Sequence, residues 1–135
     1  MLKNIYLCFI LVFSCSNASA EWTLIYENLE KESKYYVDLD SIIKKNNSVR
    51  IITLEDYRIP IVIKKESFKL SYNSVKSLAK FNCSNNSVRV LSYSVYDSQM
   101  ANSEPLMSKG TPFDWEKINI NTVNSAYLNI ACNES

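Results

Sequence analysis

Apolar residues recur at every second position along much of this chain, which is the spacing of a β-strand with one buried face. Runs rich in aromatic and β-branched residues at 22–27, 34–37 and 49–57 predict three strands. Pro60 is expected to end the third strand, because proline has no N–H to give to a ladder. Residues 61–65 then extend the edge of the sheet before a lysine-rich connection.

A β-hairpin is predicted farther along the chain, where strands at 74–83 and 88–96 flank the Asn85–Asn86 turn. One face of the first strand carries Val75, Ser77, Ala79, Phe81 and Cys83. Three of these five are small, so we expect a helix to pack closely against them. Strict alternation in the second strand puts Leu91, Tyr93 and Val95 on one face and Val88, Val90 and Tyr96 on the other.

Short polar segments separate these strands. Asp38–Ser41 carries turn and cap chemistry, and residues 41–43 are expected to form one helical turn. Asn46–Asn47 predicts a tight turn, because Asn tolerates positive φ better than other residues with a side chain. Residues 98–117 are expected to be irregular.

A helix is predicted at the C-terminus, with Thr122 as its N-cap. Helical spacing follows in Val123, Ala126, Tyr127 and Ile130. The pattern therefore predicts an α+β domain: an antiparallel sheet of about five or six strands flanked by a C-terminal helix.

The first twenty residues have the pattern of a secretory signal peptide. Lys3 precedes the apolar run 5–13, and Ala18–Ala20 offers a small-x-small cleavage site. A transmembrane anchor would need about 20 apolar residues, so residues 1–20 are read as a signal and 21–135 as one domain. Lipidation at Cys15, within a loose lipoprotein box, stays an alternative. The protein is expected to be exported to the periplasm, the outer membrane or the cell surface.

Export reduces the four cysteines to two, because cleavage after Ala20 leaves only Cys83 and Cys132. Two thiols in an oxidising compartment usually pair. The bridge would close a loop of about 50 residues and stabilise the fold by about 4 kcal/mol in the chain-entropy model. Free buried thiols and intermolecular pairing remain alternatives at this point.

Charge narrows the class of partner. Removing Lys3 leaves 14 basic and 14 acidic residues in 21–135, a net charge of zero (14 − 14), which argues against a nucleic-acid partner. A lysine-rich stretch is a candidate basic patch for an acidic partner: Lys64, Lys65, Lys69, Lys76 and Lys80. The alternative is a solvated run that protects a sheet edge from aggregation.

The sequence offers little catalytic chemistry. There is no histidine and only one glycine, which removes Ser-His and Cys-His nucleophiles, the common zinc sites and a glycine-rich phosphate loop. Carboxylates pair at Asp38/Asp40 and Glu55/Asp56; we assign them to turn capping and a solvated strand end rather than to a cation site or an acid–base couple. The sequence predicts a non-enzymatic protein with no cofactor and no metal.

Several weak motifs occur together in order and over nearly all of residues 21–135. They are Trp22, Tyr36-Val37-Asp38 with Ser41-Ile42, Asp56-Tyr57-x-x-Pro60, Ser74–Ser77 leading to Cys83, Arg89, Tyr96-Asp97, Trp115-x-x-Ile118 and the tail closing at Cys132. In this order they resemble the surface-adhesin protein E-like family of Gram-negative bacteria. The chain departs from that pattern in its weak lipid-attachment box and in Ile120–Thr122, where the family often has Pro-Gly-Ser.

The resemblance implies an antiparallel sheet whose C-terminal helix is tethered by a disulfide matching Cys83–Cys132. It also implies a binding protein whose partners are host matrix or serum proteins. The alternative is a periplasmic structural or assembly factor that contacts another envelope protein through a sheet edge. A homodimer stays open.

Overall fold

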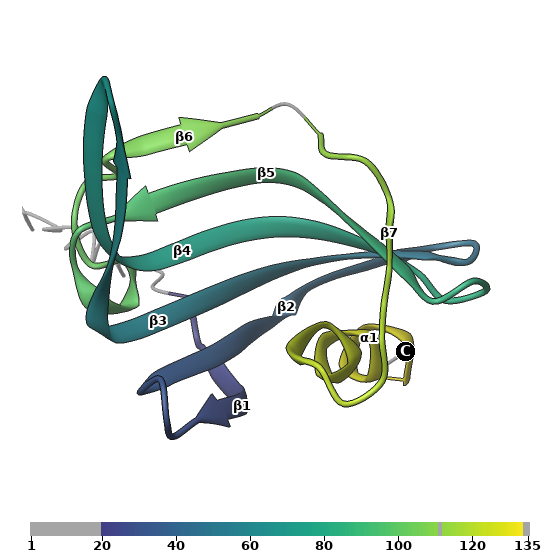
Figure 1. The fold of residues 1–135 in the computed structure, drawn as a ribbon. Helices are drawn as coiled ribbons and strands as arrows, with labels where there is room; N and C mark the ends of the chain where they lie inside the picture. The colour runs from purple at the N-terminus through teal and green to yellow at the C-terminus, as the bar shows by residue number, and fades with distance from the viewer. Residues whose placement is uncertain (1–19, 111, 134–135) are drawn as a thin grey trace, which may run out of the picture.

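In the computed structural model, which describes residues 20–110 and 112–133, one antiparallel sheet carries a single α-helix on one side (Figure 1). The predicted signal peptide and Cys15 lie outside the described residues. The strands are β1 (Thr23–Asn28), β2 (Ser33–Lys45), β3 (Ser48–Lys65), β4 (Phe68–Asn82), β5 (Ser87–Tyr96), β6 (Met107–Lys109) and β7 (Glu116–Lys117). The helices are the short η1 (Gln99–Ala101) and α1 (Val123–Asn133).

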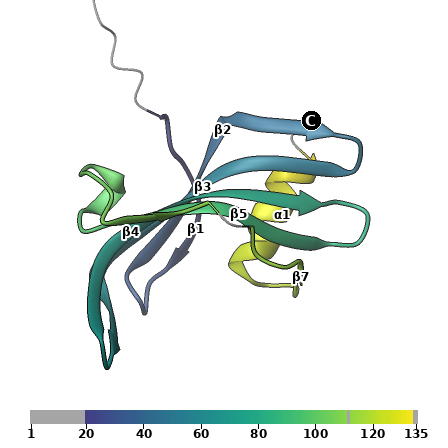
Figure 2. The ribbon, with the colours of Figure 1, turned by 90° about the horizontal axis from the view of Figure 1, so that it is seen from above.

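The sheet is a meander in which β1 to β6 lie in chain order and β7 pairs with β5. The α+β architecture expected from the residue pattern is therefore confirmed. Figure 2 shows α1 lying beneath one end of the sheet, near the turns that join β2 to β3 and β4 to β5. No helix in the described ranges has the length and apolar character needed to cross a membrane.

Strand β3 does not end at Pro60, which corrects the sequence prediction. It runs on to Lys65 and pairs again from Ile61, opposite Tyr72. Its register slips between Asp56 and Ile61, so Pro60 falls in a stretch without ladder partners in β4, where a missing N–H breaks no pairing. Residues 61–72 form a hairpin, here called the β3–β4 arm, which curves away from the rest of the sheet (Figures 1 and 2).

The expected helical turn at residues 41–43 is also wrong, because this segment belongs to β2. The polar residues of the segment make an irregularity in the strand instead. The Ser41 hydroxyl donates to the carbonyl of Asp38 (2.6 Å) and accepts the N–H of Ile52 (2.8 Å), which ties the irregular stretch to β3. The predicted tight turn at Asn46–Asn47 is confirmed, with Asn46 at φ 55°.

The core lies between α1 and the sheet. Its buried members are Val37, Val49, Ile51, Ala79, Phe81, Val88, Ile118, Tyr127 and Ala131. Small side chains on β4 leave room for the helix as predicted, and the ring of Tyr127 packs 6.4 Å from that of Phe81, between centroids. Burying such side chains supplies most of the stabilisation of a small domain.

Helix α1 is fixed at both ends. The Thr122 hydroxyl accepts the N–H of Ser125 (3.2 Å), which confirms the predicted N-cap. Cys83, directly after β4, is bonded to Cys132 in the last turn of the helix, with an S–S distance of 2.08 Å and Cα atoms 5.8 Å apart. The disulfide therefore joins the sheet to the helix.

Strict alternation fails in β5, which corrects the predicted faces. Leu78 pairs with Ser92 but its neighbour Ala79 pairs with Val90, so Leu91 is an extra residue in the strand. The extra residue shifts the alternation by one. As a result Val90 and Tyr93 lie on the same face of the sheet, the face that α1 packs against.

Candidate functional site

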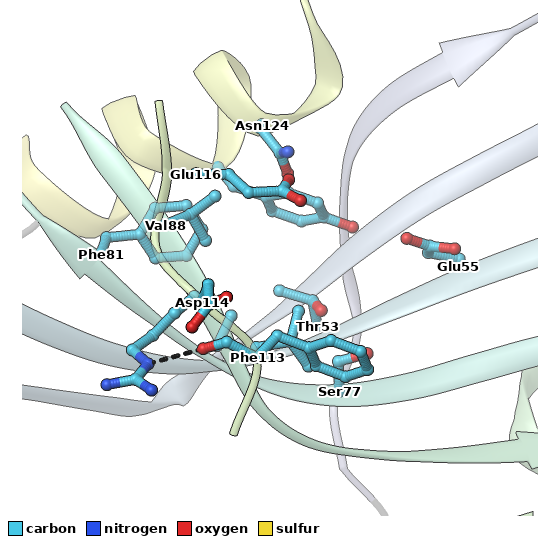
Figure 3. A pocket seen from close by; sticks show the side chains of 13 residues that line it. Thr53, Glu55, Ser77, Phe81, Val88, Phe113, Asp114, Glu116 and Asn124 are labelled. Atoms are coloured by element: carbon cyan, nitrogen blue, oxygen red, sulfur yellow. Dashed lines mark hydrogen bonds between the residues drawn. The ribbon is translucent and has the colours of Figure 1, made fainter. Parts of the chain in front are cut away.

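The helix covers only part of its side of the sheet, and a groove lies beside it. A cavity of about 220 Å³ at the start of α1 has its floor on β3, β4 and β5 (Figure 3). A second cavity of about 320 Å³ continues it along the sheet. The two share Glu55, Ser77, Val90 and Phe113, so we treat them together as the helix-side groove.

The walls of the groove come from two segments that are distant from its floor in sequence. Asn124 and Tyr127 of α1 form one wall, and residues 113–116 form the other. This returning segment is held to β5, because the Phe113 N–H donates to the Val90 carbonyl (2.9 Å). Arg89 Nε in turn donates to the Phe113 carbonyl (2.9 Å), as Figure 3 shows.

A half-buried carboxyl lies in the floor. Glu55 follows Val49, Ile51 and Thr53 on the helix side of β3, so the pleat points it into the groove. Burial raises its pKa, and a hydrogen bond that its Oε2 accepts from the Tyr57 hydroxyl (2.6 Å) partly offsets that rise. Burial also raises the pKa of Tyr57, and the Glu55 charge adds to the effect. The Tyr57 phenol is therefore a lasting donor to the carboxylate.

The charges around the cavity are mostly negative. Asp114 and Glu116 reach it from the returning segment, whereas Glu55 lies on the sheet (Figure 3). Arg89 is the cationic residue in the lining. An acidic recess of this kind favours basic groups on whatever enters it.

Four tyrosines extend the groove floor across the sheet in edge-to-face contact. We call Tyr26, Tyr35, Tyr57 and Tyr72 the tyrosine ladder. Successive ring centroids are 5.7, 6.4 and 6.1 Å apart, and each pair is close to T-shaped. Such rings combine a large apolar surface with a polar tip, which is the chemistry of many protein-contact surfaces.

A second polar group is buried at the helix wall. The Tyr127 hydroxyl has no hydrogen-bond partner among the described residues. The Thr53 hydroxyl is close enough to lower its pKa slightly, but the two do not meet hydrogen-bond geometry. Burial nevertheless dominates and raises the pKa of Tyr127, with a smaller contribution from Glu55. The groove thus presents a neutral phenol and a carboxyl to hydrogen-bond a partner.

The polar groups of the groove include carboxyls, hydroxyls and phenols. Among the oxygen groups of the cavity at the start of α1 are the carboxyls of Glu55, Asp114 and Glu116, the hydroxyls of Thr53 and Ser77, and the phenol of Tyr127. Within residues 20–110 and 112–133 no three potential metal ligands gather.

The five lysines of the predicted patch are spread from the β3–β4 arm to the far end of β4. Lys64 and Lys69 are cross-strand partners in the β3–β4 arm, with Lys65 beside them, whereas Lys80 is near the opposite end of the sheet. Lys69 and Lys80 are eleven positions apart, about 36 Å along the strand. Lys76 is between them and contacts the ring of Tyr96 (6.0 Å). The five do not form one surface, and their binding role stays a prediction.

The two predicted carboxylate pairs, Asp38/Asp40 and Glu55/Asp56, do not form a cation site. In the first pair a carboxylate accepts a backbone N–H, and in the second the two side chains lie on opposite faces of the sheet. Asp38 Oδ1 accepts the Asp40 N–H (3.1 Å), which is the expected turn chemistry. Glu55 and Asp56 are not at a solvated strand end as predicted. Glu55 enters the groove, whereas Asp56 is buried on the other face, where it accepts the Met100 N–H (2.7 Å). Because they lie on opposite faces, they cannot act as one couple.

Sequence reasoning missed the groove. The alternation of β3 already placed Glu55 on the face of Ile51, which is a signal that could have singled out a carboxyl on a buried face. The walls of the groove had no comparable signal, since they depend on how residues 113–127 return across the sheet.

The family model of surface-adhesin protein E matches residues 22–133. The chain belongs to the surface-adhesin protein E family. The family is one of adhesins and not of enzymes. No curated protein sequence matches the chain.

Solved structures of Haemophilus influenzae protein E share the family's fold with this chain. One is 16% identical, with a TM-score of 0.62 over 87% of this chain and 88% of that chain. Crystal form II of the same protein is 19% identical, with a TM-score of 0.59 over 74% and 80%. A third, from a non-typeable strain, is 17% identical with a TM-score of 0.59 over 87% and 79%. At these identities the likeness establishes the fold.

Proposed function

We propose that this protein is an exported, non-enzymatic adhesin that is displayed at the cell surface and binds a host matrix or serum protein. Membership of the surface-adhesin protein E family over residues 22–133 carries the proposal. The N-terminal signal directs export. Cleavage before Cys15 rather than after Ala20 would leave Cys15 as a lipid-bearing N-terminus that displays the domain.

The helix-side groove supports a protein partner. Tyr72, Tyr93 and Phe113 line its outer part beside the half-buried Glu55 carboxyl. Aromatic anchors in a partly desolvated recess are typical of interface hot spots. A partner that fills the recess must also satisfy Glu55, because a carboxylate removed from water without a partner is costly. We therefore expect the bound segment to present a lysine or arginine side chain to Glu55.

The test of display is flow cytometry on intact cells with an antibody against the domain. The proposal expects signal without permeabilisation. Signal that appears only after permeabilisation would rule out adhesion. Intact-mass analysis of the purified protein complements this, since it reports the cleavage site, any lipid on Cys15 and the two-hydrogen deficit of the disulfide together.

The groove is tested by binding to immobilised matrix and serum proteins. Phe113→Asp adds charge to the groove wall at a side chain that is 43% exposed, so the fold should tolerate it. Binding should fall by about tenfold or more, which is typical of a lost aromatic hot spot. Phe68→Asp is the matched control, since Phe68 is 48% exposed on the β3–β4 arm. Equal losses in both variants would place the contact elsewhere.

One observation favours the second candidate, a periplasmic assembly factor. Strand β1 pairs with β2 only as far as Val37, so residues 39–45 of β2 form the outer edge of the sheet in the described structure. An edge of this kind can accept a strand from another protein. Pull-down from envelope extracts separates the two functions: a single bacterial envelope partner supports the assembly factor, whereas matrix-protein binding supports the adhesin.

A further inference from the structure

The face of the sheet that turns away from α1 carries two neighbouring rows of residues in register, at the end where the β2–β3 and β4–β5 turns lie (Figure 1). The first row crosses β2 to β5 through Ile43, Arg50, Lys80 and Arg89. The second crosses β2 to β7 through Lys45, Ser48, Asn82, Ser87 and Lys117. We call these nine residues the cationic face.

The pleat assigns these residues to the far face. Val49, Ile51 and Val88 belong to the core under α1, so the residues alternating with them point the other way. Five of the nine positions are cations and none is an acid. Glu116, the neighbour of Lys117, lines the helix-side groove on the opposite face. Since residues 21–135 are neutral in sum, these five positive charges are a local excess.

The cross-strand pairing of these cations does not stabilise the fold. Arg50 pairs directly with Lys80, and Lys80 pairs directly with Arg89. Like charges directly opposite each other on adjacent strands are destabilising. The ion pair found among the described residues joins Arg58 to Glu32, far from this row in register. Edge protection does not account for the row either, because Arg50 and Lys80 are on the interior strands β3 and β4.

The cations are partly held in place. Arg89 Nε donates to the Phe113 carbonyl (2.9 Å), and its guanidinium lies 5.5 Å from the centre of the Trp115 ring. Trp115 itself is 40% exposed, so an aromatic surface borders the row. At the other end, a surface hollow of about 490 Å³ is lined by Ile43, Lys45, Asn46, Ser48, Arg50 and Lys80. It brings hydroxyl and amide groups next to three cations.

We propose that the cationic face binds an anionic polysaccharide. Adjacent strands are about 4.8 Å apart, so a row across five strands extends about 19 Å, and the two rows are about 7 Å apart. These dimensions match an extended chain with several negative groups better than one small anion. Arg50, Lys80 and Arg89 contact its sulfate or carboxylate groups. Asn46 and Ser48 hydrogen-bond its hydroxyls.

A polysaccharide fits this face better than a lipid surface. The positions between Lys45 and Lys117 are Ser48, Asn82 and Ser87, which are polar and have no affinity for acyl chains. Ile43 is the one aliphatic side chain of the nine. Eight of the nine residues lie outside the lining of the helix-side groove. Arg89 borders both surfaces, because its Nε donates to the Phe113 carbonyl in the groove wall.

The experiment measures the binding of the exported, purified protein to heparin and to dextran sulfate, with uncharged dextran as the reference probe. The proposal expects binding to both charged polymers, with an affinity that falls as salt rises because counterions are released. Lys80→Glu should weaken binding by at least about tenfold, since it removes one charged contact and repels the polymer. The same change should raise the melting temperature, because the new carboxylate can pair with both Arg50 and Arg89.

Lys69→Glu is the matched control. It also removes a like-charged cross-strand pair, with Lys64, but in the β3–β4 arm. It should leave binding within about twofold of the original protein, a change too small for a lost charged contact. Equal losses in Lys69→Glu and Lys80→Glu would overturn the assignment to the cationic face.

The remaining probes separate the sources of the polysaccharide from other polyanions. Binding of heparin alone supports a host glycan, and binding of bacterial lipopolysaccharide as well supports an envelope glycan. Equal affinity for single-stranded DNA would reduce the face to a non-specific cation cluster and overturn the proposal. Binding to vesicles of phosphatidylglycerol without binding to either charged polymer would overturn it in favour of a membrane surface.

Discussion

The side of the sheet that faces α1 has a covered half and an open half, and the two are built from different chemistry. Under the helix, the floor is aliphatic and aromatic, with Val49, Ile51, Ala79 and Phe81 fully or almost fully buried. Beyond the helix, the floor holds the Glu55 carboxyl and the tyrosine ladder, and Phe113 stands in the wall. The same strands, β3 and β4, supply both halves.

Within each of the strands β3 and β4, one part stabilises the fold and another part is available to contact a partner. The covered half contains what a small domain needs to fold, namely burial and a covalent link. The open half contains groups that an isolated fold would not select: a carboxyl with its pKa raised by burial, and rings left partly in water. Strained or costly groups of this kind concentrate where a protein binds something.

The largest expected effect comes from removing the link in the covered half. The double variant Cys83→Ser, Cys132→Ser should lose about 4 kcal/mol of unfolding free energy, because the disulfide closes a loop with a sequence separation of 49 residues. Urea denaturation of the original disulfide-bonded protein and of the double serine variant measures this loss. A loss below about 1 kcal/mol would show that burial alone holds α1.

A pair of phenylalanine variants compares the two halves directly. Phe81→Ala should cost about 3 kcal/mol, because Phe81 is 1% exposed and its removal leaves a cavity against Tyr127. Phe113→Ala in the open half should cost less than about 0.5 kcal/mol, as is usual for an exposed side chain. Thermal and urea unfolding of both variants gives the comparison. Similar costs would mean that the groove wall is structural.

The start of α1 should contribute a smaller amount. Thr122→Ala removes the oxygen that accepts the Ser125 N–H, and we expect a loss of about 1 kcal/mol in urea unfolding. Thr122→Ser keeps the acceptor and serves as the control. If both variants lose the same amount, the hydroxyl is not the cap.

The smallest change is expected at Glu55, and it is a gain that depends on pH. Because burial raises the pKa of Glu55 in the folded protein, its contribution to stability is most favourable below the unfolded pKa and is lost as pH rises through the folded pKa. Glu55→Gln keeps an acceptor for the Tyr57 hydroxyl but carries no charge. It should match the original protein in acid and exceed its unfolding free energy at neutral pH.

One outcome of the pH series for Glu55→Gln would contradict the prediction. A constant difference between the two proteins from acid to neutral pH would mean that Glu55 does not titrate differently on folding. Glu27→Gln, at a side chain exposed to solvent on β1, controls for the general effect of removing one negative charge.

Local patterns predicted the parts of this fold whose determinants are close together in the sequence. The cap at Thr122, the turn at Asn46 and the small face of β4 all depend on neighbouring residues, and all are confirmed. The errors come from positions where the strand register slips or an extra residue interrupts the alternation of faces. Pro60 did not end β3, because a register slip placed it where no partner was needed. Leu91 inverted the expected faces of β5, because an extra residue breaks a period of two.

The two surfaces proposed to bind partners needed the tertiary structure for the same reason. The lysines nearest in sequence, Lys64 to Lys80, are spread over the length of a strand, whereas Arg50, Lys80 and Arg89 are side by side only because three strands pair in one register. The groove walls come from a segment some 60 residues after Glu55. Local propensity holds no information about such distances, which only the pairing of strands and the return of the chain decide. By itself the sequence determined the class of fold, the two cysteines available for the staple and the resemblance to its family; the register of the sheet decided which charges and rings share a surface.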